Sequence, residues 1–265
     1  MNGLSTRRRL GWLLLMLLAL FAWLGPWVLG GDPRAQDLSR SLQPPSVQSW
    51  LGTDLFGREV LLRLAAAARL SLGLAVLAML GAALPGVALG VLAAWRGGWV
   101  ERALVLLADA ALALPGLLLV LLFAALAPGQ LWALYVGLAL AMWVEYFRVS
   151  RAAARPVLWG DAVQAARLLG LGRWHVWRRH LLPALWPLCL GLAPLSVAQA
   201  VLSLAALGFI GVGLQPPMAE LGLMMTEYLP HYQEAPWLMP APVGVLMWLV
   251  LGLMLAGERD LEGRA

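Results

Sequence analysis

The sequence contains no lysine, one cysteine and few charged residues of any kind. All 19 basic residues are arginines, so the chain cannot supply the lysine of a Gly-x-x-x-x-Gly-Lys-Ser/Thr phosphate-binding loop. The single Cys189 excludes a disulfide within the chain and a cysteine-rich metal site. The chain therefore cannot hydrolyse ATP on a loop of that type.

Charge is scarce because apolar residues dominate. Of the 265 residues, 62% are hydrophobic and 12% are charged, whereas soluble domains average about 45–50% apolar and about 25% charged residues. The apolar residues form blocks of about 20, which is the length that crosses a hydrocarbon layer as a helix. The composition predicts an all-α membrane protein. The net charge of +5 follows from arginines in loops and does not indicate nucleic acid as a partner.

Six transmembrane helices are predicted, the fifth long enough to be tilted or broken. Residues 10–29 form an anchor and not a cleaved signal, since the apolar run continues past Gly25 and Pro26 without a small-x-small cleavage site. The predicted spans are 10–29, 71–94, 104–126, 131–148, 184–213 (with Pro194, Gly208, Gly211 and Gly213 as places for a break) and 237–256. The predicted regions are an N-terminal anchor at 1–30, an external loop and interfacial segment at 31–69, a transmembrane domain at 70–256 with a cytoplasmic loop at 155–183, and a tail at 257–265.

The arginines also predict the orientation of the chain. With both termini in the cytoplasm, 14 arginines fall on the cytoplasmic side and 5 on the external side. Cytoplasmic loops carry the excess of basic residues in multi-pass membrane proteins. This orientation places the arginine-rich residues 161–185 in the cytoplasm.

The cytoplasmic loop has the pattern of two short helices. Asp161 suits the N-cap or first turn of a helix over 161–169, and Gly170 suits its end. A second helix is predicted from Arg173 to Leu181, ended by Pro183. One face of the first helix carries small or apolar residues at helical spacing: Ala162, Ala165, Ala166 and Leu169. The pattern fits docking into a groove of a soluble partner, or a loop lying on anionic lipid, and the residues leave both open.

The loop resembles the signature of binding-protein-dependent ABC importer permeases. That signature is Glu-Ala-Ala, three residues, Gly, nine residues and Ile-x-Leu-Pro, and the spacing here is the same. Residues 50–72, 107–119, 143–158 and 202–225 are similar to further segments of the dipeptide/oligopeptide/nickel branch, and the resemblance extends over about 48–260. The matching loop positions are Gln164, Ala165, Ala166, Gly170, His180, Leu182 and Pro183.

The resemblance implies a type I ABC importer permease fold in the bacterial cytoplasmic membrane. It implies that Asp161 and the matching loop positions form the coupling helix, which docks on an ATP-hydrolysing subunit. The implied partners are a second permease subunit, one or two ATP-binding subunits that hold ATP and Mg²⁺, an external substrate-binding protein, and lipid. No catalytic residue, cofactor or metal is expected in this chain. The branch transports dipeptides, oligopeptides, nickel and metal chelates, and the short external sequence favours nickel or a metal chelate.

Two positions depart from the family pattern. Gln164 replaces the glutamate of the signature, so an ion pair to the ATPase would become a weaker neutral hydrogen bond. After Pro217 the usual tryptophan before glycine is missing, because the chain reads Met218 at that point and reaches Gly222 without one. The family's external contact at this place is therefore not carried over.

Four charged residues near the membrane are candidates for structural or pathway roles. Asp109 lies inside the third predicted span, where a carboxylate is costly, and a pair with Arg102 or with the partner permease is favoured over a pathway role. Glu145 lies near the end of the fourth span, and we expect it to pair with Arg148 or Arg151.

The histidines give weak signals for a site. His231 with Glu227 and Glu234 is interpreted as an exposed polar face in preference to a metal site. His175 and His180 are five residues apart, which is a poor spacing for shared metal ligation on a helix.

Two other functions were weighed against an importer subunit. A stand-alone secondary transporter lacks support because no inverted repeat is visible. An intramembrane protease needs a nucleophile paired with a base; Ser196 and Ser203 lie in the fifth span, but all three histidines lie in predicted loops. A transport subunit that is not an enzyme is the prediction.

Overall fold

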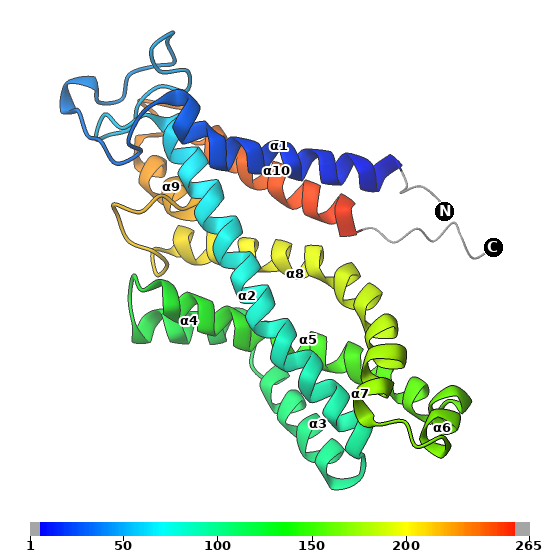
Figure 1. Ribbon diagram of the computed structural model, residues 1–265. Helices are drawn as coiled ribbons and strands as arrows, with labels where there is room; N and C mark the ends of the chain where they lie inside the picture. Colours follow the sequence, from blue (N-terminus) through cyan, green and yellow to red (C-terminus); the bar gives the residue numbers. More distant parts are fainter. Residues whose placement is uncertain (1–5, 258–265) are drawn as a thin grey trace.

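The computed structural model describes residues 6–257, which fold into a bundle of helices without a β-sheet (Figure 1). Residues 1–5 and most of the predicted tail, 258–265, lie outside the described range. The α-helices are α1 (Thr6–Leu29), α2 (Val60–Arg96), α3 (Gly98–Leu112), α4 (Gly116–Leu126), α5 (Leu131–Trp159), α6 (Asp161–Leu168), α7 (Arg173–Val176), α8 (Leu182–Ile210), α9 (Leu221–Tyr228) and α10 (Pro240–Gly257). Shorter turns are η1 (Leu38–Arg40), the π-helical η2 (Trp177–Leu181) and η3 (Leu229–His231).

The prediction of an all-α membrane protein is confirmed. In the described residues, α1, α2, α10 and the continuous helix Arg173–Ile210 are long and apolar enough to cross a membrane, and α3 with α4 adds a fifth crossing if the bent pair is one span. α5 has the length, but Glu145 and the arginines of its second half make it more polar. The six predicted spans correspond to α1, α2, α3–α4, α5, α8 and α10. The count of six is approximate, because it includes the bent pair α3–α4 and the more polar α5.

α2 is the longest helix, and its most extensive contact is with α5. The two backbones approach closely at glycines. A Cβ atom on Gly86 would lie 2.6 Å from the Trp143 carbonyl oxygen, and one on Gly90 would lie 2.5 Å from the Phe147 carbonyl oxygen. Small residues at such crossings allow the close van der Waals packing that holds membrane helices together.

The predicted third span is broken into two helices. α3 ends at Leu112 and α4 begins at Gly116, and the two helices meet at an angle of 77°. The cause lies at Pro115, which has no backbone N–H to donate and disfavours the helical conformation of Leu114 before it. The interpretation of 104–126 as one straight helix was wrong.

Other boundaries also differ from the predictions. α2 begins at Val60, so the external segment 31–69 ends in helix. α5 continues to Trp159, well past the predicted end at 148. The fifth predicted span is not broken at Pro194 or Gly208, which lie inside α8 (Figure 1). It ends at Gly211, whose φ of +83° is the left-handed conformation that glycine adopts at helix ends.

The helices give the molecule two ends with different elements. Figure 1 shows the beginning of α1, the end of α10 and α6 toward one end, with residues 31–59 and α9 at the other. α1 packs along α10, where the Trp248 indole donates a hydrogen bond of 3.1 Å to the Leu14 carbonyl. The side of the membrane on which each end lies stays a prediction from the arginines.

We predict that Gly90→Ala destabilises the chain whereas Gly73→Ala on the same helix does not. An added methyl group at Gly90 meets the backbone of α5, whereas nothing lies within 4 Å of one at Gly73. Overpacking of this kind costs about 1–3 kcal/mol. Thermal unfolding in detergent should show a lower midpoint for Gly90→Ala only, and equal midpoints for the two variants would contradict close packing of α2 on α5.

Candidate functional site

The short helix predicted in the basic loop is present as α6, and its end is well defined. Asp161 lies in its first turn, as expected, and Gly160 occupies the N-cap. At the other end, the N–H of Leu171 donates to the Ala166 carbonyl and the N–H of Gly170 to the Arg167 carbonyl, both at 3.0 Å. Gly170 has a φ of +75°. This is a Schellman motif, which satisfies the last carbonyls of the helix and fixes the direction in which the chain leaves it.

Buried apolar residues attach this loop to the long helices. Val163 of α6 forms one buried cluster with Val176 and Leu181 of the second helix. The same cluster includes residues from the ends of α2 and α5: Val91, Ala94, Ala154 and Leu158. The loop is therefore a packed extension of the bundle and not a free segment.

The exposed side of α6 differs from the predicted face. Ala166 is only 5% exposed and faces the bundle, so its assignment to the same surface as Ala165 was wrong. Ala165 is exposed, and Leu168 and Leu169 are 89% and 78% exposed. The Gln164 amide donates a hydrogen bond of 3.2 Å to the Trp159 carbonyl. The free surface of α6 is thus a small apolar patch beside a polar side chain that is already engaged.

The second helix of the loop does not stop at Pro183. α7 and the π-helical turn η2 lead into α8 as one continuous helix, and Pro183 lies inside it, directly after η2. Pro183 has no backbone N–H to donate to the preceding turn. The N–H of Leu182 donates to the Trp177 carbonyl, five residues back, in the π-helical pattern. Leu182 and Pro183 are exposed and His180 is half-buried. Leu181 is buried, whereas Trp174 is exposed. The loop and α8 are joined without a break in the helix, so a movement of the loop would also move the beginning of α8.

Arginines of α5 bind carboxylates of α3, whereas the predicted pairs of Asp109 with Arg102 and of Glu145 with Arg148 or Arg151 do not form within residues 6–257. Arg148 pairs with Asp109 at 2.6 Å, in place of Arg102. The Arg151 Nε donates to Glu101 at 2.9 Å. Glu145 forms no ion pair within residues 6–257. These pairs form because α3 lies against α5. The pair of Arg148 with Asp109 is half-exposed and thus contributes at most about 1 kcal/mol to stability.

The opposite end holds a buried cluster of four charged side chains that sequence reasoning missed. Asp54 binds Arg58 at 2.6 Å and Arg63 at 2.7 Å. Glu227 binds Arg63 at 2.7 Å and Arg58 at 3.3 Å. Two guanidinium groups and two carboxylates balance, which is what the burial of charge requires. Burial also raises the pKa of the neighbouring Tyr228 phenol.

This cluster, hereafter the ionic cluster, joins segments that are distant in the sequence. Arg63 and Glu227 are 164 residues apart. Residues 50–72 resemble a segment of the peptide and nickel branch, but nothing in that stretch indicates Glu227 as the partner of Arg63. The sequence predicts that Glu227, His231 and Glu234 form one exposed polar face. In the structure Glu227 belongs to the ionic cluster. His231 lies 3.7 Å from Glu234. The described residues contain no group of three potential ligands suited to a metal ion.

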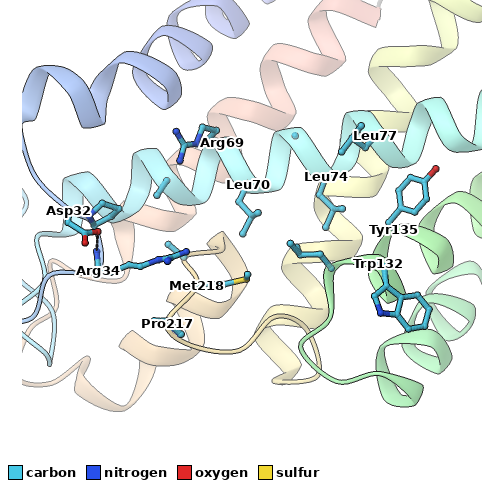
Figure 2. Close-up of a pocket in the computed structure, with 15 residues that line it drawn as sticks. Asp32, Arg34, Arg69, Leu70, Leu74, Leu77, Trp132, Tyr135, Pro217 and Met218 are labelled. Carbon is cyan, nitrogen blue, oxygen red and sulfur yellow. Dashed lines mark hydrogen bonds between the residues drawn. The ribbon is translucent and has the colours of Figure 1, made fainter.

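A cavity of about 700 Å³ opens near the ionic cluster, between α2, the beginning of α5 and the segment before α9. Figure 2 shows Leu70 and Leu74 of α2 on the same side as Met218, with Trp132 and Tyr135 entering from α5. The rim carries three charged side chains: Asp32, Arg34 and Arg69. An apolar cavity with a few charged groups at its mouth is the usual form of a small-molecule site.

A third buried carboxylate, Glu220, lies beside this cavity at the N-cap of α9. It accepts a hydrogen bond of 2.9 Å from the Leu223 N–H and one of 3.3 Å from the Ser71 hydroxyl. Gly208 of α8 packs directly on it. Burial raises the pKa of this carboxyl, since the charged form loses its hydration.

Comparison with known proteins agrees with this architecture. Residues 86–257 match the family of binding-protein-dependent transport system inner membrane components. The chain is 37% identical to the di/tripeptide transport system permease protein DppC of Pseudomonas aeruginosa (strain UCBPP-PA14), over 94% of this chain and 84% of the relative. It is 32% identical to the probable D,D-dipeptide transport system permease protein DdpC of Escherichia coli (strain K12), with the same coverage.

A nickel permease is equally similar. The nickel transport system permease protein NikC of Escherichia coli (strain K12) is 33% identical over 94% of this chain and 90% of the relative. The helical fold and the loop define a multi-pass membrane permease. The chain belongs to the binding-protein-dependent transport system inner membrane components, in the peptide and nickel branch, and is a permease subunit of an ABC importer.

We predict that Arg63→Gln lowers the free energy of unfolding by about 3 kcal/mol, because Asp54 and Glu227 then share only Arg58 and one negative charge of the ionic cluster is no longer balanced. Arg69→Gln is the matched control, since Arg69 is exposed on the same helix and forms no ion pair within residues 6–257. The measurement is unfolding of both variants in detergent. A loss equal to that of Arg69→Gln would show that the ionic cluster does not stabilise the fold.

A second prediction concerns pH. Because the folded pKa of Glu220 is raised, its contribution to stability is greatest below the ordinary value of 4.5 and falls as pH rises through the folded pKa. Glu220→Gln stays neutral, so the stability of this variant relative to wild type should increase with pH above about 4.5. Melting curves of both proteins between pH 4 and pH 8 would test this, and a constant difference would refute it.

Proposed function

We propose that this chain forms half of the translocation pathway of an ATP-driven importer and couples to the ATPase through α6. The exposed patch of Ala165, Leu168 and Leu169 is the observation that carries the proposal. Three apolar or small side chains on one helix, at the tip of a basic loop, suit a helix-in-groove contact with a soluble subunit. A loop that lay flat on lipid would not need the defined end that Gly170 gives this helix.

The attachment of α6 supports a mechanical role. Val163 packs in one buried cluster with residues at the ends of α2 and α5, and the second helix of the loop continues into α8. A displacement of α6 by a closing ATPase would therefore move three long helices together. Gln164 is engaged with Trp159, so we expect apolar contact, and not an ion pair at this position, to supply the binding energy.

The pathway itself requires a second permease subunit in this proposal. The cavity of about 700 Å³ is lined by one chain, and its open side is where a partner would complete the wall. The names of the relatives indicate small peptides or nickel as cargo, so we propose peptides or a nickel or metal chelate as substrate. An external substrate-binding protein would deliver it to the end that carries residues 31–59.

We expect Ala165→Arg to abolish uptake without unfolding the chain. Ala165 is exposed, so arginine fits the isolated chain, but in the docked complex its charge would be buried without a partner. That costs more than about 1.4 kcal/mol, so ATPase binding should weaken at least about tenfold. The measurements are co-purification of the ATP-hydrolysing subunit from cells and substrate-stimulated ATP hydrolysis.

Ala35→Arg is the control, because Ala35 is also exposed but lies in the loop at the other end. It should co-purify with the ATPase as wild type does. Normal uptake by Ala165→Arg, or a wild-type chain that purifies without any ATPase, would contradict the coupling role of α6.

A further inference from the structure

A groove with arginines at one end and aliphatic side chains at the other lies beside the coupling loop, between α2 and the second helix of that loop. Its volume is about 390 Å³. A smaller cavity of about 340 Å³ adjoins it and shares Trp95 and Arg173. We call the two together the basic groove. Its lining consists of Ala88, Val91, Leu92, Trp95, Arg96, Arg167, Leu171, Arg173, Trp174, Val176 and Trp177.

The arginines of the basic groove are not neutralised by the chain. Arg96, Arg167 and Arg173 come from α2, α6 and α7, and none forms an ion pair within residues 6–257. The sequence around them is poor in acids, since Asp161 is the only acidic residue between Glu145 and Glu220. Three arginines that line one groove without a carboxylate partner attract an anion.

The rest of the lining shows which kind of anion fits. Ala88, Val91 and Leu92 continue the groove along α2, a helix that crosses the membrane. Trp95, Trp174 and Trp177 also line the groove, and tryptophan is enriched at the depth of lipid headgroups. A free phosphate would use only the arginines, and a soluble protein cannot follow α2 into the hydrocarbon layer.

We propose that the basic groove binds an anionic phospholipid, with its phosphate at Arg96, Arg167 and Arg173 and the beginning of an acyl chain against Val91 and Leu92. The lipid would connect the end of α2 to the coupling loop. Basic pockets between helices at the membrane surface bind phospholipid headgroups in this manner. This proposal is independent of the cargo and of the ATPase contact.

The test is native mass spectrometry of the detergent-purified importer, or of the full chain, after incubation with phosphatidylglycerol or phosphatidylethanolamine. Wild type should retain phosphatidylglycerol in preference. The variant Arg96→Gln/Arg167→Gln/Arg173→Gln should retain it at least about tenfold less, because each arginine near the surface contributes about 1 kcal/mol. The control Arg102→Gln/Arg178→Gln/Arg179→Gln removes equal charge from exposed positions outside the groove and should retain lipid as wild type does.

Each other outcome overturns the proposal. Equal losses in both triple variants would mean diffuse attraction by net charge. Displacement of the lipid by millimolar glycerol phosphate would mean a phosphate site without a role for the acyl chain. If the groove variant loses its ATPase subunit but keeps its lipid, the arginines belong to the protein contact. Unfolding of the groove variant is checked by its melting temperature, and Trp174→Ala with its arginines intact then serves as the second test, with reduced lipid retention expected.

Discussion

Close packing of α2 on α5 is the contact on which the rest of the structure depends. In hydrocarbon there is no hydrophobic force between helices, so they associate through van der Waals contact where small residues let the backbones approach. Gly86 and Gly90 provide that approach. The pair then fixes both ends of the molecule, since the beginning of α2 carries Arg63 into the ionic cluster and the end of α5 leads directly into α6.

The two ends are stabilised by different chemistry. The end with residues 31–59 buries Asp54, Arg58 and Arg63 with Glu227, an arrangement that tolerates little change because each charge needs its partner. The end with α6 is held by methyl and aliphatic contacts. The ion pair of Arg148 with Asp109 is half-exposed and therefore weak. When a partner displaces this end in the proposed mechanism, apolar contacts leave no buried charge without its partner.

Sequence reasoning succeeded where the signal is local and failed where it is not. Apolar blocks, the acid at Asp161 and the glycine at Gly170 act within a few residues, so the long helices and α6 were predicted. The partner of Asp109 depends on how α3 crosses α5, and that of Arg63 lies 164 residues away, which no periodicity reveals. The bend at Pro115 was the one readable signal missed: an apolar run long enough for a span outweighed the proline inside it.

The orientation of α6 gives a physical reason for two adjacent alanines in the loop. Ala166 is buried against the bundle, whereas Ala165 faces outward. A larger residue at Ala166 would push α6 away from the bundle, and a larger one at Ala165 would hold the proposed ATPase away from α6. Both contacts must be close if a small displacement is to pass through the helix undiminished, because interiors packed at crystal-like density transmit strain. One requirement thus comes from the fold and the other from the proposed function.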